Sequence, residues 1–256
     1  MTKFMNHVEW KDALFLHYEA DPIALEALLP PELIVDTYKG KAYVGVVALS
    51  ELGITPTFLP QWLRRLLALS HHAVNVRTYV RYGANGHPGI YFFTLDCSHF
   101  LPAMGARLLF NLPYRLAAMT RQVLNGGTLW LFKSSRRFSH ARLEVEWKID
   151  EDAVSTHAAS DSLPFFFVER YCLYNTSGSF LRLLGQSRLW RGSISHRPWP
   201  VQEATVTNLH NTVLAAVGGM NEAIVPRKAP LAHFSNGVND ISFYFERIAF
   251  RGRKLC

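Results

Sequence analysis

Tyr114 and Arg115 stand together directly after Pro113, and both side chains can do chemistry. A tyrosine hydroxyl donates a hydrogen bond or, with a lowered pKa, acts as an acid or a base. An arginine guanidinium fixes a carboxylate or polarises a carbonyl group. The alternative is structural: the tyrosine ring packs on the core with its hydroxyl satisfied, and the arginine caps a helix. The two residues alone leave both interpretations open.

A second group of polar side chains follows from a period of two. Residues 74–82 alternate apolar and polar positions, which predicts a strand with Asn75, Arg77 and Tyr79 on one face. A buried Arg77 would need a partner, because an unpaired interior charge is costly. Glu169 is the candidate partner. The pattern therefore predicts either a ligand-binding group made by Asn75, Arg77, Tyr79 and Glu169 or an ion pair of the scaffold.

His196 lies at the end of a predicted strand, beside the sequence Pro198-Trp199-Pro200. A histidine there can serve as a general base near neutral pH, with Glu169 to orient it. The alternative is a histidine that is hydrogen-bonded beneath an aromatic ring. We keep His196 as a candidate catalytic residue beside Tyr114 and Arg115.

Metal and cofactor sites lack support in the sequence. Asp96, Cys97 and His99 lie close together, but no second cluster with zinc spacing accompanies them, and a turn after a strand explains them better. The motifs GxxxxGK[ST], GxGxxG, GxSxG and HExxH are all absent. We therefore expect no metal, no cofactor, and neither nucleotide-binding nor serine-hydrolase nor zincin chemistry.

Composition indicates an ordinary globular protein. The chain has 256 residues, of which 49% are hydrophobic, enough for a sizeable core. The net charge is +7, and most basic residues are arginine, which suits recognition of an anionic small ligand. Because the charges are scattered, a solvated basic surface explains them equally simply. No aromatic and basic motif indicates nucleic-acid binding.

The location expected from the sequence is the cytoplasm. The N-terminal residues lack the apolar core of a signal peptide. No stretch approaches the roughly 20 apolar residues that span a bilayer, so no transmembrane segment is expected. The three cysteines show neither CxxC spacing nor the even count of a disulfide scaffold, which fits a reducing compartment. The sequence is compatible with a homo-oligomer as well as with a monomer.

The elements that must position these residues are mostly strands. Asp21 and Pro22 begin a predicted helix that ends before Pro30 and Pro31, within residues 22–33. Further helices are expected at 102–123, broken or kinked by Pro113, and at 211–217. Predicted strands lie at 42–49, 74–82, 90–95, 128–134, 141–149, 188–196 and 204–209. Strands 74–82 and 90–95 should form an antiparallel hairpin. This order favours one α+β, mainly β domain over residues 1–256.

Several stretches in one order carry a family resemblance. They are WKDALFLH at 10–17, LLPPEL at 28–33, NVRTYV at 75–80, GIYFFTLD at 89–96, LPY at 112–114, ERYCLY at 169–174 and HRPWP at 196–200. The chain resembles the YqjF-like family of uncharacterised bacterial proteins, a branch of the acetoacetate decarboxylase-like superfamily. The resemblance implies an antiparallel, barrel-like cone of strands with a central ligand cavity and a few peripheral helices.

The resemblance also implies that one chemistry is missing. The decarboxylases carry two consecutive lysines at the positions of Tyr114 and Arg115, and neither a phenol nor a guanidinium can form a Schiff base. Many relatives also have a glutamate where this chain has Ala73. By analogy with the lysine pair, the charge of Arg115 would favour the phenolate of Tyr114, unless the guanidinium turns outward to solvent.

Two functions therefore stand open. The first is an enzyme that acts on a small oxo or carboxylate compound without Schiff-base chemistry. The second is a non-catalytic protein that holds an apolar or anionic metabolite in the same cavity. Convergent titratable groups in the cavity would favour the enzyme, and a mostly apolar wall would favour the binder.

Overall fold

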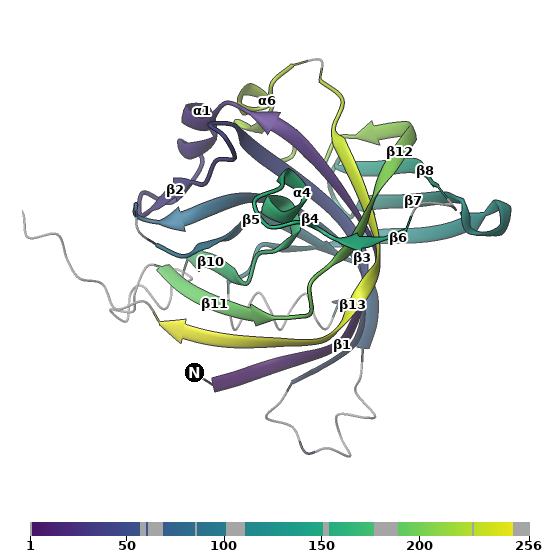
Figure 1. The fold of residues 1–256 in the computed structure, drawn as a ribbon, viewed down its shortest axis with the longest axis horizontal. Helices are drawn as coiled ribbons and strands as arrows, with labels where there is room; N and C mark the ends of the chain where they lie inside the picture. Colours follow the sequence, from purple (N-terminus) through teal and green to yellow (C-terminus); the bar gives the residue numbers. More distant parts are fainter. Residues whose placement is uncertain are drawn as a thin grey trace, which may run out of the picture.

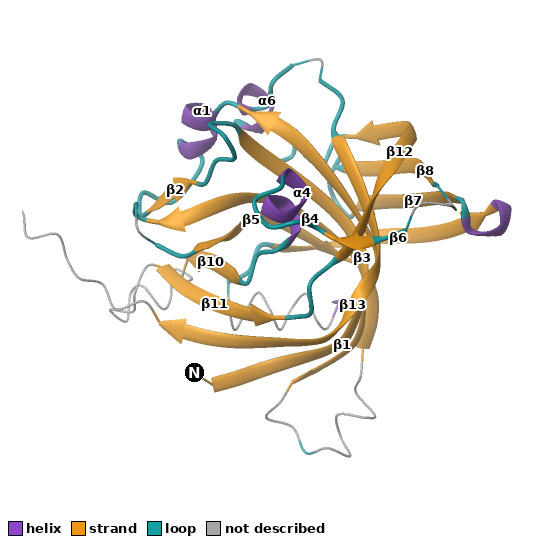
Figure 2. Ribbon diagram, viewed as in Figure 1, coloured by secondary structure: helices purple, strands orange, loops and turns teal. Residues whose placement is uncertain are grey.

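The computed structural model describes residues 2–56, 60, 69–84, 86–100, 111–150, 154–176, 189–226 and 228–247. Strands make up most of this part of the chain (Figures 1 and 2). They are β1 Thr2–Ala20, β2 Leu33–Val35, β3 Ala42–Pro56, β4 Leu69–Tyr82, β5 Pro88–Cys97, β6 Tyr114–Leu124, β7 Leu129–Arg136, β8 Arg142–Ile149, β9 Thr156–His157, β10 Cys172–Thr176, β11 Leu189–Ser195, β12 Pro200–Asn211 and β13 Leu231–Arg247. The short helices are α1 Pro22–Glu26, α4 Leu163–Val168 and α6 Met220–Ala223, with the 3₁₀ turn η1 Asn125–Gly127.

Seven of the strands close into a ring. Strands β4, β3, β1, β13, β11, β10 and β5 are hydrogen-bonded in that order, and β5 pairs with β4 again. Strands β6, β7, β8 and β12 continue the sheet from β5 and return to β13, forming a second layer beside the ring (Figure 1). Neighbours are mostly antiparallel, but β5 runs parallel to β10 and to β6. The expected cone-like, mainly β fold is confirmed.

Residues 13–18 of β1 are buried on both faces, which explains the nearly continuous apolar run there. Leu14 and Leu16 belong to the core between the ring and the second layer, where they join Trp147. Phe15, which lies between them in sequence, belongs to a separate core inside the ring. Full burial of each such side chain stabilises the fold by roughly 1.5–3 kcal/mol. Alternation along a doubly covered strand thus builds two cores, one of which surrounds the site described below.

Helix α4 fills one end of the ring (Figure 1). Its N-cap is Ser162, whose side chain accepts from Phe165 N at 3.2 Å, and Pro164 occupies the first turn. Phe167 is fully buried and stacks on the ring of His17, with centroids 3.7 Å apart. The local sequence therefore makes one short, capped helix whose aromatic side chains close the interior of the ring.

A backbone irregularity bends β1 and β13 where they pass the ring interior. Asp12 adopts a positive φ of 51°, and the pairing of β1 with β3 shifts register between Lys11 and Leu14. Opposite, Gly237 has a φ of 128°, and a Cβ atom there would lie 2.1 Å from the carbonyl oxygen of Trp10. Only glycine fits this close approach.

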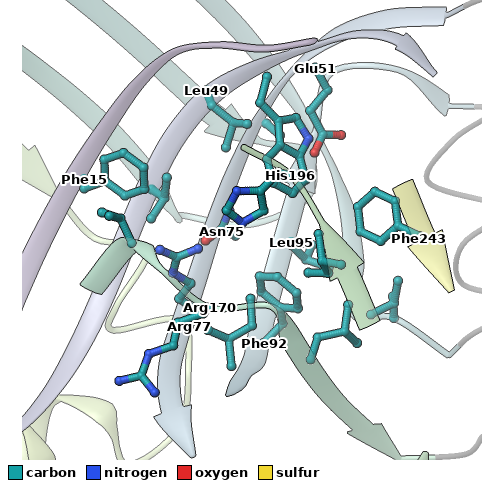
Figure 3. Close-up of a pocket in the computed structure, with 18 of the residues that line it drawn as sticks. Phe15, Leu49, Glu51, Asn75, Arg77, Phe92, Leu95, Arg170, His196 and Phe243 are labelled. Atoms are coloured by element: carbon teal, nitrogen blue, oxygen red, sulfur yellow. The ribbon is translucent and has the colours of Figure 1, made fainter. Parts of the chain in front are cut away.

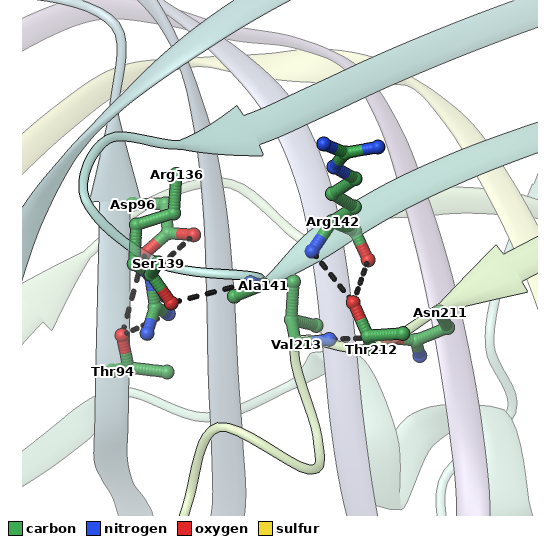
Figure 4. A network of polar contacts seen from close by, with 9 residues as sticks. All are labelled: Thr94, Asp96, Arg136, Ser139, Ala141, Arg142, Asn211, Thr212 and Val213. Carbon is green, nitrogen blue, oxygen red and sulfur yellow. Dashed lines mark hydrogen bonds and ion pairs between the residues drawn. The ribbon is translucent and has the colours of Figure 1, made fainter.

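A buried ion pair joins the ring to the second layer (Figure 4). Arg136 Nη2 lies 2.8 Å from Asp96 Oδ1, and its Nε donates to both carboxylate oxygens. Arg136 Nη2 also donates to Thr94 Oγ1 at 2.8 Å. The strand β6 lies between β5 and β7, which carry these residues, so the pair fixes the junction from which Tyr114 extends.

A second set of contacts in Figure 4 ties the β12 end to β8. Thr212 Oγ1 accepts from Arg142 N at 2.8 Å, and Asn211 Oδ1 accepts from Val213 N at 3.1 Å. These bonds satisfy backbone groups where the strand ends.

The strand predictions at 42–49, 74–82, 90–95, 128–134, 141–149 and 204–209 are confirmed, and β4 and β5 form the expected antiparallel pair. The strand predicted at 188–196 is confirmed from residue 189, because residue 188 lies outside the described residues. The helix at 22–33 is shorter than expected, because α1 ends at Glu26. The long strands β1 and β13 were not predicted. No helix in the part of the chain that the structure describes is long and apolar enough to cross a membrane.

Two helix predictions were wrong. Residues from Tyr114 onward form the strand β6 instead of the second half of a helix, because their backbone pairs with β5 and with β7 and this tertiary pairing overrides helix propensity. The first half of that predicted helix, at 101–110, lies outside the described residues. Residues 211–217 end β12 and enter turns, and the nearest helix is α6.

Candidate functional site

The ring holds a cavity of about 100 Å³ whose wall is mainly apolar. A volume of this size suits a metabolite of a few heavy atoms, since pockets for drug-sized ligands measure roughly 300–1,000 Å³. Among the described residues, the lining side chains with strongly polar groups are Glu51, Asn75, Arg77, Tyr114, Arg170 and His196.

The cavity has two distinct polar ends. Figure 3 shows Arg77 and Arg170 at one end and Glu51 at the other. Register agrees with this view: Arg77 pairs with Gly45 and His71 pairs with Glu51, so six residues of β4 separate the two levels. At the usual rise of a strand this is roughly 20 Å of backbone. The cavity is therefore basic at one end and carries a carboxylate at the other.

Asn75 and Arg77 lie next to each other on the inner face of β4, as alternation predicted. Arg77 Nη2 donates to the carbonyl oxygen of Phe167 at 3.2 Å, and the guanidinium lies 5.7 Å from the ring centre of Phe15. Arg77 Nε and Asn75 Oδ1 are both buried, and neither has a hydrogen-bond partner within the described residues. Such groups are rare in folded proteins, because a buried polar atom without a partner costs about 1–3 kcal/mol.

Arg170 is held in place by the scaffold. Its Nη1 lies 2.7 Å from Asp36 Oδ2, and its Nε donates to the carbonyl oxygen of Phe166 at 2.7 Å. Asp36 also binds Arg81 at 2.8 Å, so one carboxylate orients two arginines. Arg170 follows the candidate Glu169 in the sequence, and it lines the cavity although Glu169 does not. It adds fixed positive charge at the same end of the cavity as Arg77.

Tyr114 points into the cavity, and Arg115 does not. Tyr114 lines the wall, while Arg115 is exposed, as the period of two in β6 requires. Burial raises the pKa of Tyr114 well above its usual range, and charges at Glu51 and Cys97 act in the same direction. Tyr114 is therefore a neutral phenol at neutral pH and donates a hydrogen bond. The outward-turned alternative holds for Arg115, and the phenolate expected from its charge is not supported.

Glu51 is a cavity residue that the sequence did not reveal as one. It follows Val47 and Leu49 on the inner face of β3, and all three line the wall. Its Oε2 lies 3.2 Å from Nε2 of His71. Continuing the alternation of the predicted strand 42–49 by two residues would have found it. Although Ala73 lacks a carboxylate, Glu51 on the neighbouring strand supplies one to the same cavity.

His71 lies near Glu51 and Cys97, although neither of its ring nitrogens has hydrogen-bond geometry with a described residue. Burial lowers the pKa of His71, but its contacts with Cys97 and with Glu51 outweigh that effect and raise the pKa to about 10. Cys97 is fully buried, and its Sγ atom lies 3.3 Å from the backbone nitrogen of His99. His71 is thus an imidazolium at neutral pH, placed behind the carboxylate of Glu51 as seen from the cavity.

His196 lines the cavity and packs against aromatic rings. Its Nδ1 lies 2.7 Å from the carbonyl oxygen of Arg197, and the backbone of Arg170 makes a second contact with the ring. The ring stacks on Tyr171 with centroids 4.6 Å apart and meets Trp199 edge-on. Burial lowers the pKa of His196, which keeps the ring neutral.

Glu169 and Tyr79 lie outside the cavity wall. Glu169 accepts from Trp199 N at 2.7 Å and from the hydroxyl of Tyr171, so it braces this loop and pairs neither with Arg77 nor with His196. Tyr79 is fully buried, and its hydroxyl lies 2.6 Å from His17 Nε2 and donates to the carbonyl oxygen of Phe167. Tyr79 is therefore bonded to His17 and to α4 and does not line the cavity, although it shares a strand face with Arg77.

Of the candidates named from sequence, Tyr114, His196, Asn75 and Arg77 meet in one cavity, and Arg115, Tyr79 and Glu169 do not line it. In the described ranges, no three histidine, cysteine, aspartate or glutamate side chains converge closely enough to hold a metal ion.

Structural comparison finds the same fold in proteins of very different sequence. The enduracididine biosynthesis enzyme MppR, solved in complex with pyruvate, superposes with a TM-score of 0.65 at 12% identity over 97% of this chain and 91% of MppR. Acetoacetate decarboxylase from Legionella pneumophila gives a TM-score of 0.62 at 14% identity over 97% and 90%. At such identities the likeness establishes the fold alone.

Sequence comparison gives a nearer relationship. Residues 7–239 match DUF2071, a family described as an uncharacterized conserved protein. The uncharacterized protein YqjF of Bacillus subtilis (strain 168) is 32% identical over 235 residues, which cover 92% of this chain and 88% of YqjF. The chain therefore belongs to the YqjF-like DUF2071 family of uncharacterised proteins, and it has the acetoacetate decarboxylase-like fold.

Proposed function

We propose that the cavity binds a small oxo carboxylate and acts on it without forming a Schiff base. The observation that carries this proposal is the buried Nε of Arg77, a donor with no hydrogen-bond partner within the described residues, in the wall of a cavity of metabolite size. Because leaving such a donor unpaired is costly, an anion that accepts a hydrogen bond from it gains affinity at little reorganisation cost.

The carboxylate of the ligand binds at the end of the cavity that holds Arg77 and Arg170. A guanidinium binds a carboxylate through charge-assisted hydrogen bonds, and the ion pair of Arg170 with Asp36 keeps a second cation in place beside Arg77. Only the amide nitrogen of Asn75 can donate to such a ligand, because a carboxylate has no hydrogen to give to Asn75 Oδ1. The apolar wall, which includes Phe15, Phe92 and Leu95, suits the short carbon chain of such a metabolite.

The carbonyl group of the ligand meets Tyr114. A neutral phenol donates a hydrogen bond to a carbonyl oxygen and strengthens it as negative charge develops there. No lysine is present among the described lining residues, so no amine can attack the carbonyl carbon. The pyruvate in the MppR complex agrees in size and charge with this ligand class.

Calorimetric titration of the purified protein with 2-oxobutanoate, alongside native mass spectrometry of the protein as isolated, tests the proposal. We expect saturable binding that Arg77→Met weakens at least tenfold. The matched control is Arg197→Met, because Arg197 is exposed and paired with Asp240 at the surface. Equal binding by the Arg77 variant and the wild type would overturn the proposal.

A second function, non-catalytic storage or sensing of a metabolite, is favoured by the apolar majority of the wall. The two functions separate on turnover. If the bound oxo acid is recovered unchanged, with no exchange of its hydrogens with solvent, the binder is the correct function. Chemical change that depends on Tyr114 favours the enzyme.

A further inference from the structure

Asn75 carries a hydrogen-bond acceptor that a simple oxo acid leaves unused. Its side chain lines the cavity and is buried, with 7% of the residue exposed. Its Oδ1 has no hydrogen-bond partner within the described residues. Neither a carboxylate nor a ketone has a hydrogen to give to that oxygen. An oxo acid bound at Arg77 therefore leaves a buried acceptor unsatisfied, which is costly and rare in folded proteins.

We propose that the ligand of this cavity is a short 2-oxo carboxylate whose third carbon carries a hydroxyl group, and that Asn75 Oδ1 accepts the hydrogen of that hydroxyl. This inference rests on the proposed function and names its ligand class, the 3-hydroxy-2-oxo acids. Asn75 is then the residue that determines specificity for the hydroxyl, beside Arg77 for the carboxylate and Tyr114 for the carbonyl group.

The first argument is the spacing of Asn75 and Arg77. The two residues lie two positions apart on the inner face of β4, which corresponds to about 7 Å at the usual rise of a strand. A chain of three carbons, with a hydrogen bond of about 2.8 Å at either end, bridges this interval. Asn75 is thus within reach of a small ligand that is anchored at Arg77.

The second argument is that Asn75 and Tyr114 share one level of the cavity. Asn75 on β4 pairs with Leu95 on β5, and Leu95 pairs with Tyr114 on β6. All three side chains line the wall, so the amide and the phenol flank Leu95 and approach one part of the ligand from two sides. The phenol donates to the carbonyl oxygen, and the amide oxygen accepts from a hydroxyl on the neighbouring carbon.

The amide of Asn75 is free to turn toward such a hydroxyl. Its terminal torsion joins an sp³ to an sp² carbon, and torsions of this kind have broad minima. No described residue holds Oδ1 by a hydrogen bond. A small rotation therefore brings Oδ1 to the ligand without breaking a hydrogen bond that Oδ1 makes within the described residues.

Charge at this end of the cavity selects a neutral donor. An ammonium group could also donate to Asn75, but it would lie near the guanidinium groups of Arg77 and Arg170, and like charges disfavour each other (Figure 3). A hydroxyl carries no charge and is no larger than a methyl group. It also suits a cavity of about 100 Å³.

Calorimetric titration of the wild type with three probes tests the inference. 2-Oxobutanoate, 3-hydroxypyruvate and 3-fluoropyruvate differ only in the group on the third carbon, which is methyl, hydroxyl or fluorine. Fluorine withdraws electrons as a hydroxyl does but has no hydrogen to donate. We expect 3-hydroxypyruvate to bind roughly tenfold more tightly than either of the other two. Equal affinities for 3-hydroxypyruvate and 3-fluoropyruvate would overturn the inference.

Asn75→Leu removes the acceptor and keeps the approximate size of the side chain. It should abolish the preference for 3-hydroxypyruvate, while affinity for 2-oxobutanoate changes less than about threefold. The matched control is Asn208→Leu, because Asn208 is exposed on β12, and this variant should keep the preference. A folded Asn75→Leu protein that keeps the preference would also overturn the inference.

The two proposals fail in different ways. If Asn75→Leu does not fold, as circular dichroism would show, the comparison of the three probes with the wild type decides alone. Binding of 2-oxobutanoate that depends on Arg77, without any preference for 3-hydroxypyruvate, would overturn the inference and leave the proposed function standing. Absence of binding of all three probes by the wild type would overturn the proposed function itself, and the inference with it.

Discussion

Two arginines inside this protein differ in what surrounds them. Arg136 is paired with Asp96 and Thr94 (Figure 4). Its Nε donates to the Asp96 carboxylate, and its Nη2 contacts both Asp96 and Thr94. Arg77 Nη2 donates to the backbone carbonyl oxygen of Phe167, but the buried Nε of Arg77 has no hydrogen-bond partner within the described residues. No ion pair of the described residues includes Arg77.

The difference separates a structural charge from a functional one. A buried charge that the fold has fully paired stabilises the fold only as a pair, so removal of either member leaves the other uncompensated. A charge that the fold leaves partly unpaired, in the wall of a cavity, costs stability in the free protein and recovers that cost when an anion binds. The two arginines should therefore respond to substitution in opposite ways.

The largest effect is expected at the structural arginine. Arg136→Met should lower the free energy of unfolding by about 3–5 kcal/mol, because it leaves the buried carboxylate of Asp96 unpaired. Urea unfolding followed by tryptophan fluorescence measures this free energy. The affinity of the folded fraction for 2-oxobutanoate should be unchanged. If the free energy of unfolding falls by less than about 1 kcal/mol, Arg136 is not a structural charge.

The next effect is a pH dependence of stability that belongs to His71. Its pKa is raised from 6.5 to about 10 in the folded protein, so the stability it contributes is fully present below about pH 6.5 and is lost as pH rises through about 10. The wild type should exceed His71→Phe by on the order of a few kcal/mol near pH 6, and this difference should shrink toward pH 10. A difference independent of pH would show that His71 is not charged in the folded state.

Arg77→Met should change binding rather than folding. Because the protein itself leaves Arg77 partly unpaired, the free energy of unfolding should fall by less than about 1 kcal/mol or rise. Affinity for 2-oxobutanoate should fall at least tenfold, about 1.4 kcal/mol. Thermal melting with and without ligand reports both quantities, and a large loss of stability with intact affinity would reverse the assignment.

The smallest effect is expected at Tyr114. Tyr114→Phe keeps the ring that packs in the wall and removes only the hydroxyl, so binding of 2-oxobutanoate should weaken by about 1 kcal/mol, the net value of one hydrogen bond. Exchange of the ligand hydrogens should slow by more than binding weakens, since the bond strengthens as charge develops. Equal losses in rate and affinity would make Tyr114 a binding residue alone.

Local pattern was sufficient where a strand has one apolar and one polar face. In β4, alternation placed Asn75 and Arg77 together, and the structure has both in one cavity. In β8, which confirms the predicted strand 141–149, the apolar residues Leu143, Val145 and Trp147 alternate along the chain and are buried. In both strands, the alternation of apolar and polar residues is enough to indicate which side chains point inward.

Pattern failed where distant segments decide the environment. Tyr79 shares a face with Arg77, yet its hydroxyl is bonded to α4, about ninety residues later, and it does not line the cavity. Residues 114–123 look helical by composition, but pairing with β5 and β7 makes them a strand. Strand β1 was missed because burial on both faces removes alternation. The family resemblance supplied the topology that these local patterns lack.

The residues of the candidate site also differ in whether local pattern or distant contacts identify them. Tyr114 was found through its position in the resemblance, and Glu51 was missed because the predicted strand stopped at residue 49, one inward position too early. The role of His71 depends on its contacts with Glu51 and Cys97, which only folding brings together.

The central claim is that an oxo carboxylate binds at Arg77 with its carbonyl group intact and hydrogen-bonded to Tyr114. Carbon-13 NMR of 2-oxobutanoate labelled at the carbonyl carbon, bound to the wild-type protein and to Tyr114→Phe, tests it most directly. We predict a bound resonance in the ketone region, displaced downfield from that of the free ligand, with a smaller displacement in Tyr114→Phe. A resonance in the imine region, or a bound ketone resonance identical in the two proteins, would contradict the account.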